Sequence, residues 1–154
     1  MLIQFRKAEA SDVPALSELA LRSKAHWGYA PAQLEAWRAD LTLSPLWISL
    51  HPTYVAEIGG QMVGFFALLA EHGSWKLEHL WVAPEAMGQG VGRSMLAEAV
   101  IIAKQVGANE LIIDSDPNAE GFYRACGAVR TGSIPAPIEG APQREIPVLR
   151  LAIR

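Results

Sequence analysis

The fold is decided by the stretch Leu80-Trp81-Val82-Ala83-Pro84-Glu85-Ala86-Met87-Gly88-Gln89-Gly90-Val91-Gly92-Arg93. An apolar strand pattern ends here, a short connector follows, and three alternating glycines open a helical pattern. Glycine lets backbone N–H groups approach a ligand without interference from a Cβ atom. The unpaired amides of a first helical turn, aligned with the helix dipole, bind phosphate or pyrophosphate. The stretch therefore predicts an anion-binding turn, with a tight turn that only packs helix on strand as the alternative.

Two other phosphate-binding loops fit this stretch less well. A P-loop needs Gly-Lys-Ser/Thr after its glycines, and the sequence has no such triplet. A dinucleotide fingerprint needs G-x-G-x-x-G directly after a strand and an acidic residue about 20 residues later. Asp114 and Asp116 roughly meet that last spacing, so a nicotinamide-dependent oxidoreductase is kept as an alternative. The spacing G-x-G-x-G and the connector before it disfavour that alternative.

Apolar runs and their turn signals predict the strands of the chain. We expect strands at residues 2–7, 53–58, 61–69, 75–82, 111–115 and 146–153, and a further strand that begins at Val129. Gly59-Gly60 tolerates the positive φ of a two-residue hairpin, so the strands on either side of it are expected to pair. A loop rich in proline and glycine at residues 135–142 precedes the last strand.

Apolar residues at helical spacing predict the helices. They are expected after the capping pair Ser11-Asp12, from Pro31, from the glycine stretch to Gly107, and from Asp116 to Cys126. One face of the third helix is expected to contain Val91, Met95, Ala99, Ile102 and Val106. Residues 44–52 fit either a short helical turn or a loop. The order βααβββαβαββ predicts an α/β fold with a mixed central sheet flanked by helices.

Length and composition predict one globular domain of ordinary charge. The 154 residues leave no room for a second domain, and 51% hydrophobic with 19% charged residues is typical of a compact globule. A net charge of -3 argues against a nucleic-acid-binding protein. The apolar stretches are far shorter than the ~20 residues that span a bilayer. The first residues have the pattern of a strand, not of a leader, so a cytoplasmic protein that does not bind membranes is expected.

The sequence also disfavours a metal site and a disulfide. Cys126 is the single cysteine, which excludes an intramolecular disulfide and a cysteine-rich zinc site. The four histidines share no ligand spacing such as H-x-x-x-H, so no bound metal is expected.

The glycine stretch resembles the acyl-CoA-binding motif of the GCN5-related N-acetyltransferases, the GNAT family, which is V-x-P-x-x-R/Q-G-x-G-x-G/A. The matching positions are Val82, Pro84, Gly88, Gly90 and Gly92. Met87 departs from the motif, because the family commonly has Arg or Gln there. That side chain usually helps to order the loop, while backbone amides hold the pyrophosphate.

A second segment resembles another motif of the family, N-x-x-A-x-x-F-Y-x-x-x-G-F. The matching positions are Asn118, Phe122, Tyr123 and Gly127, whereas Gly121 and Ala128 replace the usual alanine and aromatic residue. Two motifs in the right order, separated by one helix and one strand, are far more specific than either alone. The resemblance covers essentially the whole chain. It implies a single N-acetyltransferase domain over residues 1–154, with a central sheet that splays near Val82.

The resemblance also implies which residues bind acetyl-CoA, the acyl donor. The strand residues Leu80, Trp81 and Val82 would pair with the pantetheine arm, and an N–H there would polarise the thioester carbonyl. The pyrophosphate would be held by amides of Gly88, Gln89, Gly90, Val91, Gly92 and Arg93. Asn118 would reach the pantetheine or its phosphate end.

The expected chemistry needs an acid and a base. Tyr123 would face the departing sulfur and protonate it, with a ring packed in the core as the alternative. Glu78 is the preferred base for the amine, and His79 or water are alternatives. Adjacent strand residues face opposite ways, so only one of Glu78 and His79 should reach the substrate unless a bulge intervenes. Trp27 and Tyr29 lie in the break between the first two expected helices. In this family that break forms one wall of the acceptor pocket; packing in the core is the alternative.

The sequence thus predicts direct transfer of an acetyl group from acetyl-CoA to a primary amine. A CoA- or nucleotide-binding regulatory module without turnover is the first alternative, and the NAD-dependent oxidoreductase is the second. The expected partners are acetyl-CoA and an amine acceptor, without nucleic acid. The sequence does not determine the acceptor or the acyl-chain preference. It does not determine the oligomeric state either, and a homodimer is compatible with the sequence.

Overall fold

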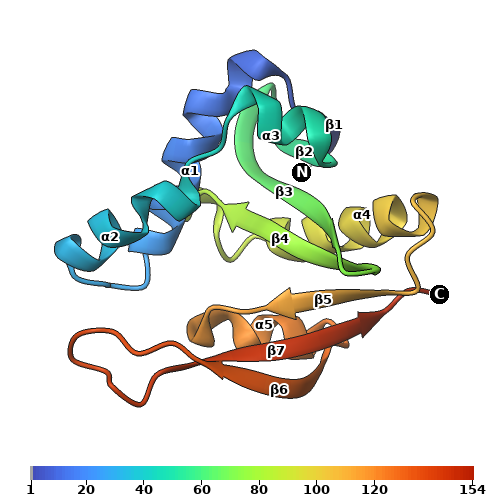
Figure 1. Ribbon diagram of the computed structural model, residues 1–154. Helices are drawn as coiled ribbons and strands as arrows, with labels where there is room; N and C mark the ends of the chain where they lie inside the picture. Colours follow the sequence, from blue (N-terminus) through green and yellow to red (C-terminus); the bar gives the residue numbers. More distant parts are fainter. Residues whose placement is uncertain (1) are drawn as a thin grey trace.

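Seven strands form one mixed sheet in the computed structural model, which describes residues 2–154 (Figure 1). The order across the sheet is β1-β2-β3-β4-β5-β7-β6. The strands are β1 (Gln4–Lys7), β2 (Thr53–Ile58), β3 (Gln61–Glu71), β4 (Ser74–Val82), β5 (Glu110–Asp114), β6 (Val129–Pro135) and β7 (Glu145–Ala152). All neighbours are antiparallel except β4 and β5, which are parallel.

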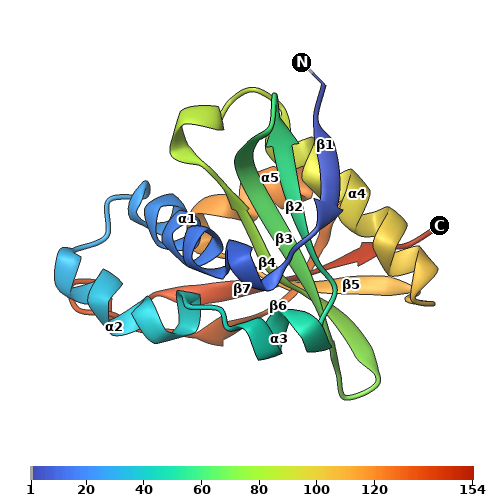
Figure 2. The ribbon, with the colours of Figure 1, turned by 90° about the horizontal axis from the view of Figure 1, so that it is seen from above.

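Helices cover both faces of the sheet. They are α1 (Val13–Ala25), α2 (Pro31–Leu41), α3 (Pro45–Leu50), α4 (Val91–Gln105) and α5 (Glu120–Ala125). α1 and α4 both contact β3 and β4, and they lie on opposite sides of these strands (Figure 2). The core between the layers is apolar, and Leu16 of α1, Phe65 and Phe66 of β3 and Met95 of α4 are fully buried. Burial of such side chains contributes about 1.5–3 kcal/mol each.

Most of the expected elements are present within one or two residues of their predicted bounds. The Gly59-Gly60 hairpin has φ of 58° and 80° at its two turn residues, as a two-residue turn requires. The undecided segment 44–52 contains the short helix α3, which begins after Ser44, whose Oγ accepts a hydrogen bond from the Trp47 amide at 3.1 Å. Residues 2 and 3 lie outside β1, and Met1 is outside the described residues.

The helical face expected from the sequence extends one residue too far. Val106 is 39% exposed, because α4 ends at Gln105 and Val106 is already its C-cap. The other four residues of that face are buried as expected.

The sheet separates between β4 and β5. The two strands share one residue pair, Lys76 with Ile112, and then diverge toward the side where α1 and α2 lie (Figure 1). Leu77 and residues 79–82 of β4 still pair with β3 on their other edge. Within the described chain, the edge of this segment that faces β5 has no strand partner. The predicted splay therefore exists, and it begins before Val82.

A β-bulge lies where the splay begins. His79 is opposite Ala67, and Leu77 is opposite Leu68, so Glu78 is the extra residue of the bulge. A bulge changes the direction in which a strand points its side chains. The strict alternation expected along this strand is therefore broken at Glu78.

We predict that Gly64→Ala destabilises the fold, because β3 and β4 approach too closely at this position. A Cβ at Gly64 would lie 2.6 Å from the Trp81 carbonyl oxygen and 2.6 Å from the Met95 sulfur. Overpacking of this kind costs about 1–3 kcal/mol, which urea denaturation would measure. The matched control is Gly132→Ala in β6, where a Cβ meets nothing within 4 Å. Equal unfolding free energies for the two variants would contradict the prediction.

Candidate active site

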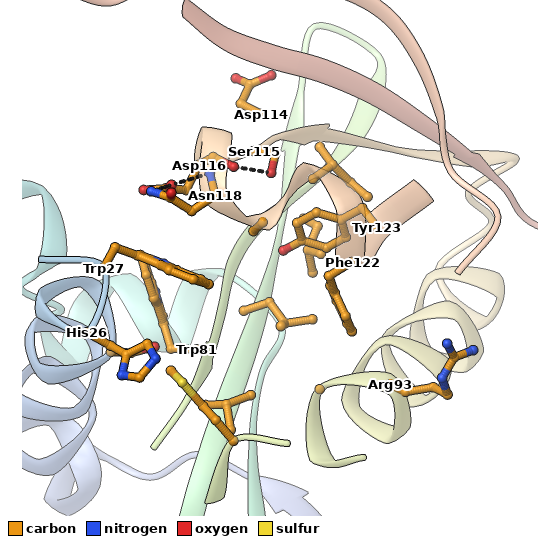
Figure 3. A pocket seen from close by; sticks show the side chains of 18 of the residues that line it. His26, Trp27, Trp81, Arg93, Asp114, Ser115, Asp116, Asn118, Phe122 and Tyr123 are labelled. Atoms are coloured by element: carbon orange, nitrogen blue, oxygen red, sulfur yellow. Dashed lines mark hydrogen bonds between the residues drawn. The ribbon is translucent and has the colours of Figure 1, made fainter. Parts of the chain in front are cut away.

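A cavity of about 570 Å³ occupies the gap between β4 and β5. It is lined by the end of α1, by β4, by the glycine stretch with the start of α4, and by the segment from β5 to α5. Trp27 and Trp81 lie on one side of it, and Phe122 and Tyr123 lie on another (Figure 3). The cavity therefore joins both sequence motifs at the splay.

The glycine stretch presents backbone amides to the cavity. Gly90 is the N-cap of α4 with φ of 82°, and the first helical hydrogen bond runs from the Ser94 amide to the Gly90 carbonyl at 3.1 Å. The amides of residues 91–93 precede that bond and have no acceptor among the described residues. A Cβ at Gly92 would come within 3.3 Å of the Phe122 ring, so this ring packs closely against the turn. These features fit a pyrophosphate.

Some side chains of the glycine stretch line the cavity and others do not. Gly88, Gly90, Gly92 and Arg93 line the cavity, as does Met87, which departs from the family motif. Val91 and Gln89 are not among the lining residues. Val91 is buried in the core, and the Gln89 amide group donates to the Glu85 carbonyl at 3.4 Å. The donor-binding role expected of these two residues is one for their backbone amides.

β4 supplies a wall with free hydrogen-bonding groups. Leu80, Trp81 and Val82 all line the cavity, and they belong to the segment whose edge has no strand partner among residues 2–154. Backbone N–H and C=O groups need partners. An extended ligand that contains amides, such as pantetheine, fits this edge as an additional strand would.

Tyr123 is buried within the cavity wall, and its hydroxyl points into the cavity (Figure 3). Its side chain is 7% exposed, and burial raises the pKa of the phenol well above its usual value. The hydroxyl has no hydrogen-bond partner in the described part of the chain. It therefore keeps its proton at neutral pH and can donate a hydrogen bond into the cavity.

Glu78 lies on the bulge and lines the same cavity. Partial burial of its carboxylate raises its pKa, an effect that Lys76 opposes and Glu71 and Asp114 increase. The carboxylate forms no ion pair with any of residues 2–154. Glu78 is thus a carboxylate at the cavity wall whose proton affinity is increased.

His79 faces a different environment. Burial lowers its pKa to about 4, so the ring is neutral at pH 7. The Trp81 indole donates to His79 Nδ1 at 2.9 Å, and an indole N–H can only donate. The proton of the neutral ring is therefore on Nε2, which leaves no free nitrogen lone pair to act as a base. His79 does not line the large cavity.

The carboxylate of Asp116 organises the end of the cavity near α1. Its Oδ2 accepts from Lys24 Nζ at 2.5 Å and from the Tyr29 hydroxyl at 2.8 Å. Its Oδ1 accepts from the backbone amide and the side-chain amide of Asn118 at 2.8 and 2.9 Å. Burial alone would raise the pKa of Asp116, but the bonds to Lys24 outweigh this and lower it. The carboxylate therefore stays charged and fixes Asn118 at the cavity wall.

Tyr29 lies behind the cavity wall instead of on its surface. Its hydroxyl bonds Asp116, and its ring is edge-on to Trp37 with centroids 4.8 Å apart. Arg144, in the loop before β7, donates to the same hydroxyl at 3.3 Å. Sequence reasoning missed Lys24, Asp116 and Arg144 as a group, because no local pattern connects positions so far apart in the chain. Trp27, by contrast, lines the cavity.

Two further observations concern the whole described part of the chain. Nowhere in residues 2–154 do three or more His, Cys, Asp or Glu side chains gather as a metal site would need. Among the same residues, no helix has the length and apolar character required to cross a bilayer.

Comparison with known proteins identifies the family. A model of the acetyltransferase (GNAT) domain matches residues 49–127, about half of the chain. The chain belongs to the GNAT family. Peptidyl-lysine N-acetyltransferase YjaB of Escherichia coli (strain K12) is 30% identical over 115 residues, which are 75% of this chain and 68% of that protein. The expected family is therefore confirmed.

Solved structures of this GNAT fold agree with the architecture. PaiA N-acetyltransferase from Thermoplasma acidophilum, in complex with coenzyme A, matches with a TM-score of 0.79 at 21% identity over 99% of both chains. YncA from Salmonella typhimurium, with acetyl-CoA, matches with a TM-score of 0.74 at 16% identity over 100% of this chain and 95% of that one. This GNAT protein is an N-acetyltransferase that takes its acetyl group from acetyl-CoA. The oxidoreductase alternative and the module without turnover are not favoured.

We predict that Gly90→Val weakens acetyl-CoA binding at least about tenfold. A β-branched side chain is strained at the φ of 82°, and it would extend into the open space above the free amides. Isothermal titration with CoA would measure the affinity. Gly107→Val is the control, since Gly107 has φ of 84° but lies at the far end of α4. If both variants bound CoA equally, the glycine would serve only the backbone turn.

Proposed function

We propose that residues 1–154 form one GNAT domain that transfers acetyl directly to a primary amine, with Glu78 as base and Tyr123 as acid. One observation supports this most strongly. Glu78 and Tyr123 line the same cavity as the free edge of β4 and the free amides of α4. Acid, base and donor-binding groups therefore face one space.

The donor is bound chiefly by backbone groups in this proposal. The free edge at Leu80, Trp81 and Val82 pairs with the pantetheine amides, and the amides at the start of α4 hold the pyrophosphate. Asn118, oriented by Asp116, contacts the pantetheine. Backbone recognition also explains how the loop functions with Met87 in place of Arg or Gln.

Glu78 removes a proton from the acceptor, because an alkyl amine is mostly protonated at neutral pH and only its neutral form attacks a thioester. A raised pKa brings this carboxylate closer to the pH at which it works, which favours general base catalysis. His79 is not used as the base, since its proton is held on Nε2 by the Trp81 bond.

Tyr123 protonates the leaving thiolate. The amine nitrogen forms a bond to the carbonyl carbon, the C–S bond breaks, and the sulfur takes the Tyr123 proton. The nitrogen gives up its second proton as the amide forms, and this proton restores the Tyr123 hydroxyl, while Glu78 releases its proton to solvent. An N–H of β4 stabilises the charge that develops on the carbonyl oxygen. No enzyme side chain becomes acylated. Cys126, half-buried at the end of α5, has no part in the reaction.

The first acceptor to test is a lysine side chain, because YjaB is named as a peptidyl-lysine N-acetyltransferase. Trp27 and Trp81, which line the large cavity, provide an apolar wall beside the thioester. We further propose that the protein acts in the cytoplasm. The homodimer considered from the sequence stays a prediction.

We predict that Tyr123→Phe lowers kcat at least about tenfold and leaves acetyl-CoA affinity nearly unchanged. The substitution keeps the buried ring but removes the proton donor, and general acid assistance is worth about 100- to 10,000-fold in rate. Release of free thiol from acetyl-CoA with a lysine peptide would measure kcat. A variant with full kcat would show that Tyr123 is only a packing residue.

We predict that Glu78→Gln removes the acidic limb of the pH–rate profile. Because the pKa of Glu78 is raised, the wild-type enzyme should lose kcat/KM as the pH falls through a value above the ~4.3 of an ordinary glutamate. Activity then requires the deprotonated form, and the glutamine variant has no such group. Glu18→Gln on the exposed side of α1 is the charge-matched control. An unchanged acidic limb in Glu78→Gln would assign the base to another group.

A further inference from the structure

A second hollow lies against β4, on the side of α2 and α3. Its volume is about 220 Å³, and it is lined by Asp40, Leu43, Ser44, Trp47, Glu78 and His79, among others. Of the residues that the structure describes, Glu78 alone lines both this hollow and the large cavity. The bulge is responsible, since it sets Glu78 apart from the alternation of its neighbours. The proposed base therefore stands between two open spaces.

The second hollow is negatively charged and has an aromatic wall. Neither Asp40 nor Glu78 forms an ion pair with any of residues 2–154, and no Lys or Arg of the described chain lines the hollow. The Trp47 ring contributes to the wall and lies edge-on to His79 at 5.5 Å. Two carboxylates that form no ion pair within residues 2–154, beside the Trp47 indole, attract a cation.

His79 adds a hydrogen-bond donor to the same hollow. Its Nε2 carries the proton of the neutral ring, because Nδ1 accepts from Trp81. The residue is 9% exposed, and Nε2 has no partner within residues 2–154. No polar side-chain atom of the described chain is both fully buried and unpaired, so this N–H reaches open space, and the hollow is the space that His79 lines. A nearly buried donor without a partner is costly unless a ligand satisfies it.

We infer that the second hollow receives the acceptor, and that the acceptor is a cationic primary amine with a hydrogen-bond-accepting oxygen. Asp40 and Glu78 hold the ammonium group, Trp47 contacts its methylene carbons, and His79 donates to the oxygen. Glu78 then accepts the ammonium proton at the boundary with the large cavity, where the thioester is bound. This inference rests on the proposed function and adds the class of acceptor and its route.

The test is an NMR titration of the CoA-saturated protein with three probes. Nα-acetyl-lysine amide has the ammonium and the oxygen, n-butylamine has the ammonium alone, and trifluoroethylamine is an uncharged amine near neutral pH. We expect the lysine amide to shift and saturate the signals of Ser44 and of the Trp47 indole. We expect n-butylamine to bind more weakly and trifluoroethylamine to cause no saturable shift. Shifts of Trp27 without Trp47 would overturn the inference, and equal binding of n-butylamine would overturn the part assigned to His79.

Asp40→Asn is the decisive variant, because Asp40 is exposed and is not part of the donor-binding machinery. We expect it to weaken binding of the lysine amide, and to raise its KM, by about three- to tenfold with kcat nearly unchanged. Glu98→Gln on α4, across the sheet from the hollow, is the charge-matched control and should change neither value. Turnover with an unchanged KM in Asp40→Asn would overturn the inference and leave the proposed function intact. Binding in the hollow without any acetyl transfer would instead overturn the proposed function.

Discussion

The free edge of β4 is the constraint on which the rest of the site depends. β4 and β5 meet at Lys76 and Ile112 and then separate, which leaves a row of backbone groups without a strand to pair with. Such groups must be satisfied. The glycine stretch, the start of α4 and Tyr123 are all arranged around the space that this separation opens. A single parallel contact between two strands thus gives the molecule both its shape and its donor site.

The buried Lys24–Asp116 pair has a positional role. Its side chains are 13% and 8% exposed, and burying two charges costs about as much as their attraction returns. The pair connects the end of α1 to the segment before α5, and the same carboxylate orients Asn118 and Tyr29. The wall that contains Trp27 and the Asn118 side chain, which we propose to contact the donor, are therefore held by one side chain. This physical link would let binding on one side of the cavity influence the other.

Local features of the fold and site could be predicted from the sequence, whereas features set by distant contacts could not. The glycine turn, the Gly59-Gly60 hairpin and the start of α4 follow from residues next to one another in the chain. The bulge at Glu78 depends on how β3 pairs with β4, and no residue type in the sequence predicts it. Lys24 and Asp116 are 92 residues apart. Tyr29 bonds Asp116 and does not line the cavity. No periodic pattern in the sequence indicates either contact. Val106 was misplaced because a helix end is the least certain part of a helical pattern.

The position of β7 has a consequence for the order in which the molecule assembles. β7 is last in the chain, yet it lies between β5 and β6. β6 pairs with no other strand of the described chain, so it joins the sheet only through β7. The amide of Ser115, next to Asp116, also bonds the β7 residue Pro147 at 2.9 Å. Contacts between distant segments form late because closing long loops costs entropy. A chain emerging from the ribosome therefore acquires the glycine turn early, but the Asn118 and Tyr123 side of the site only after its final strand has been made.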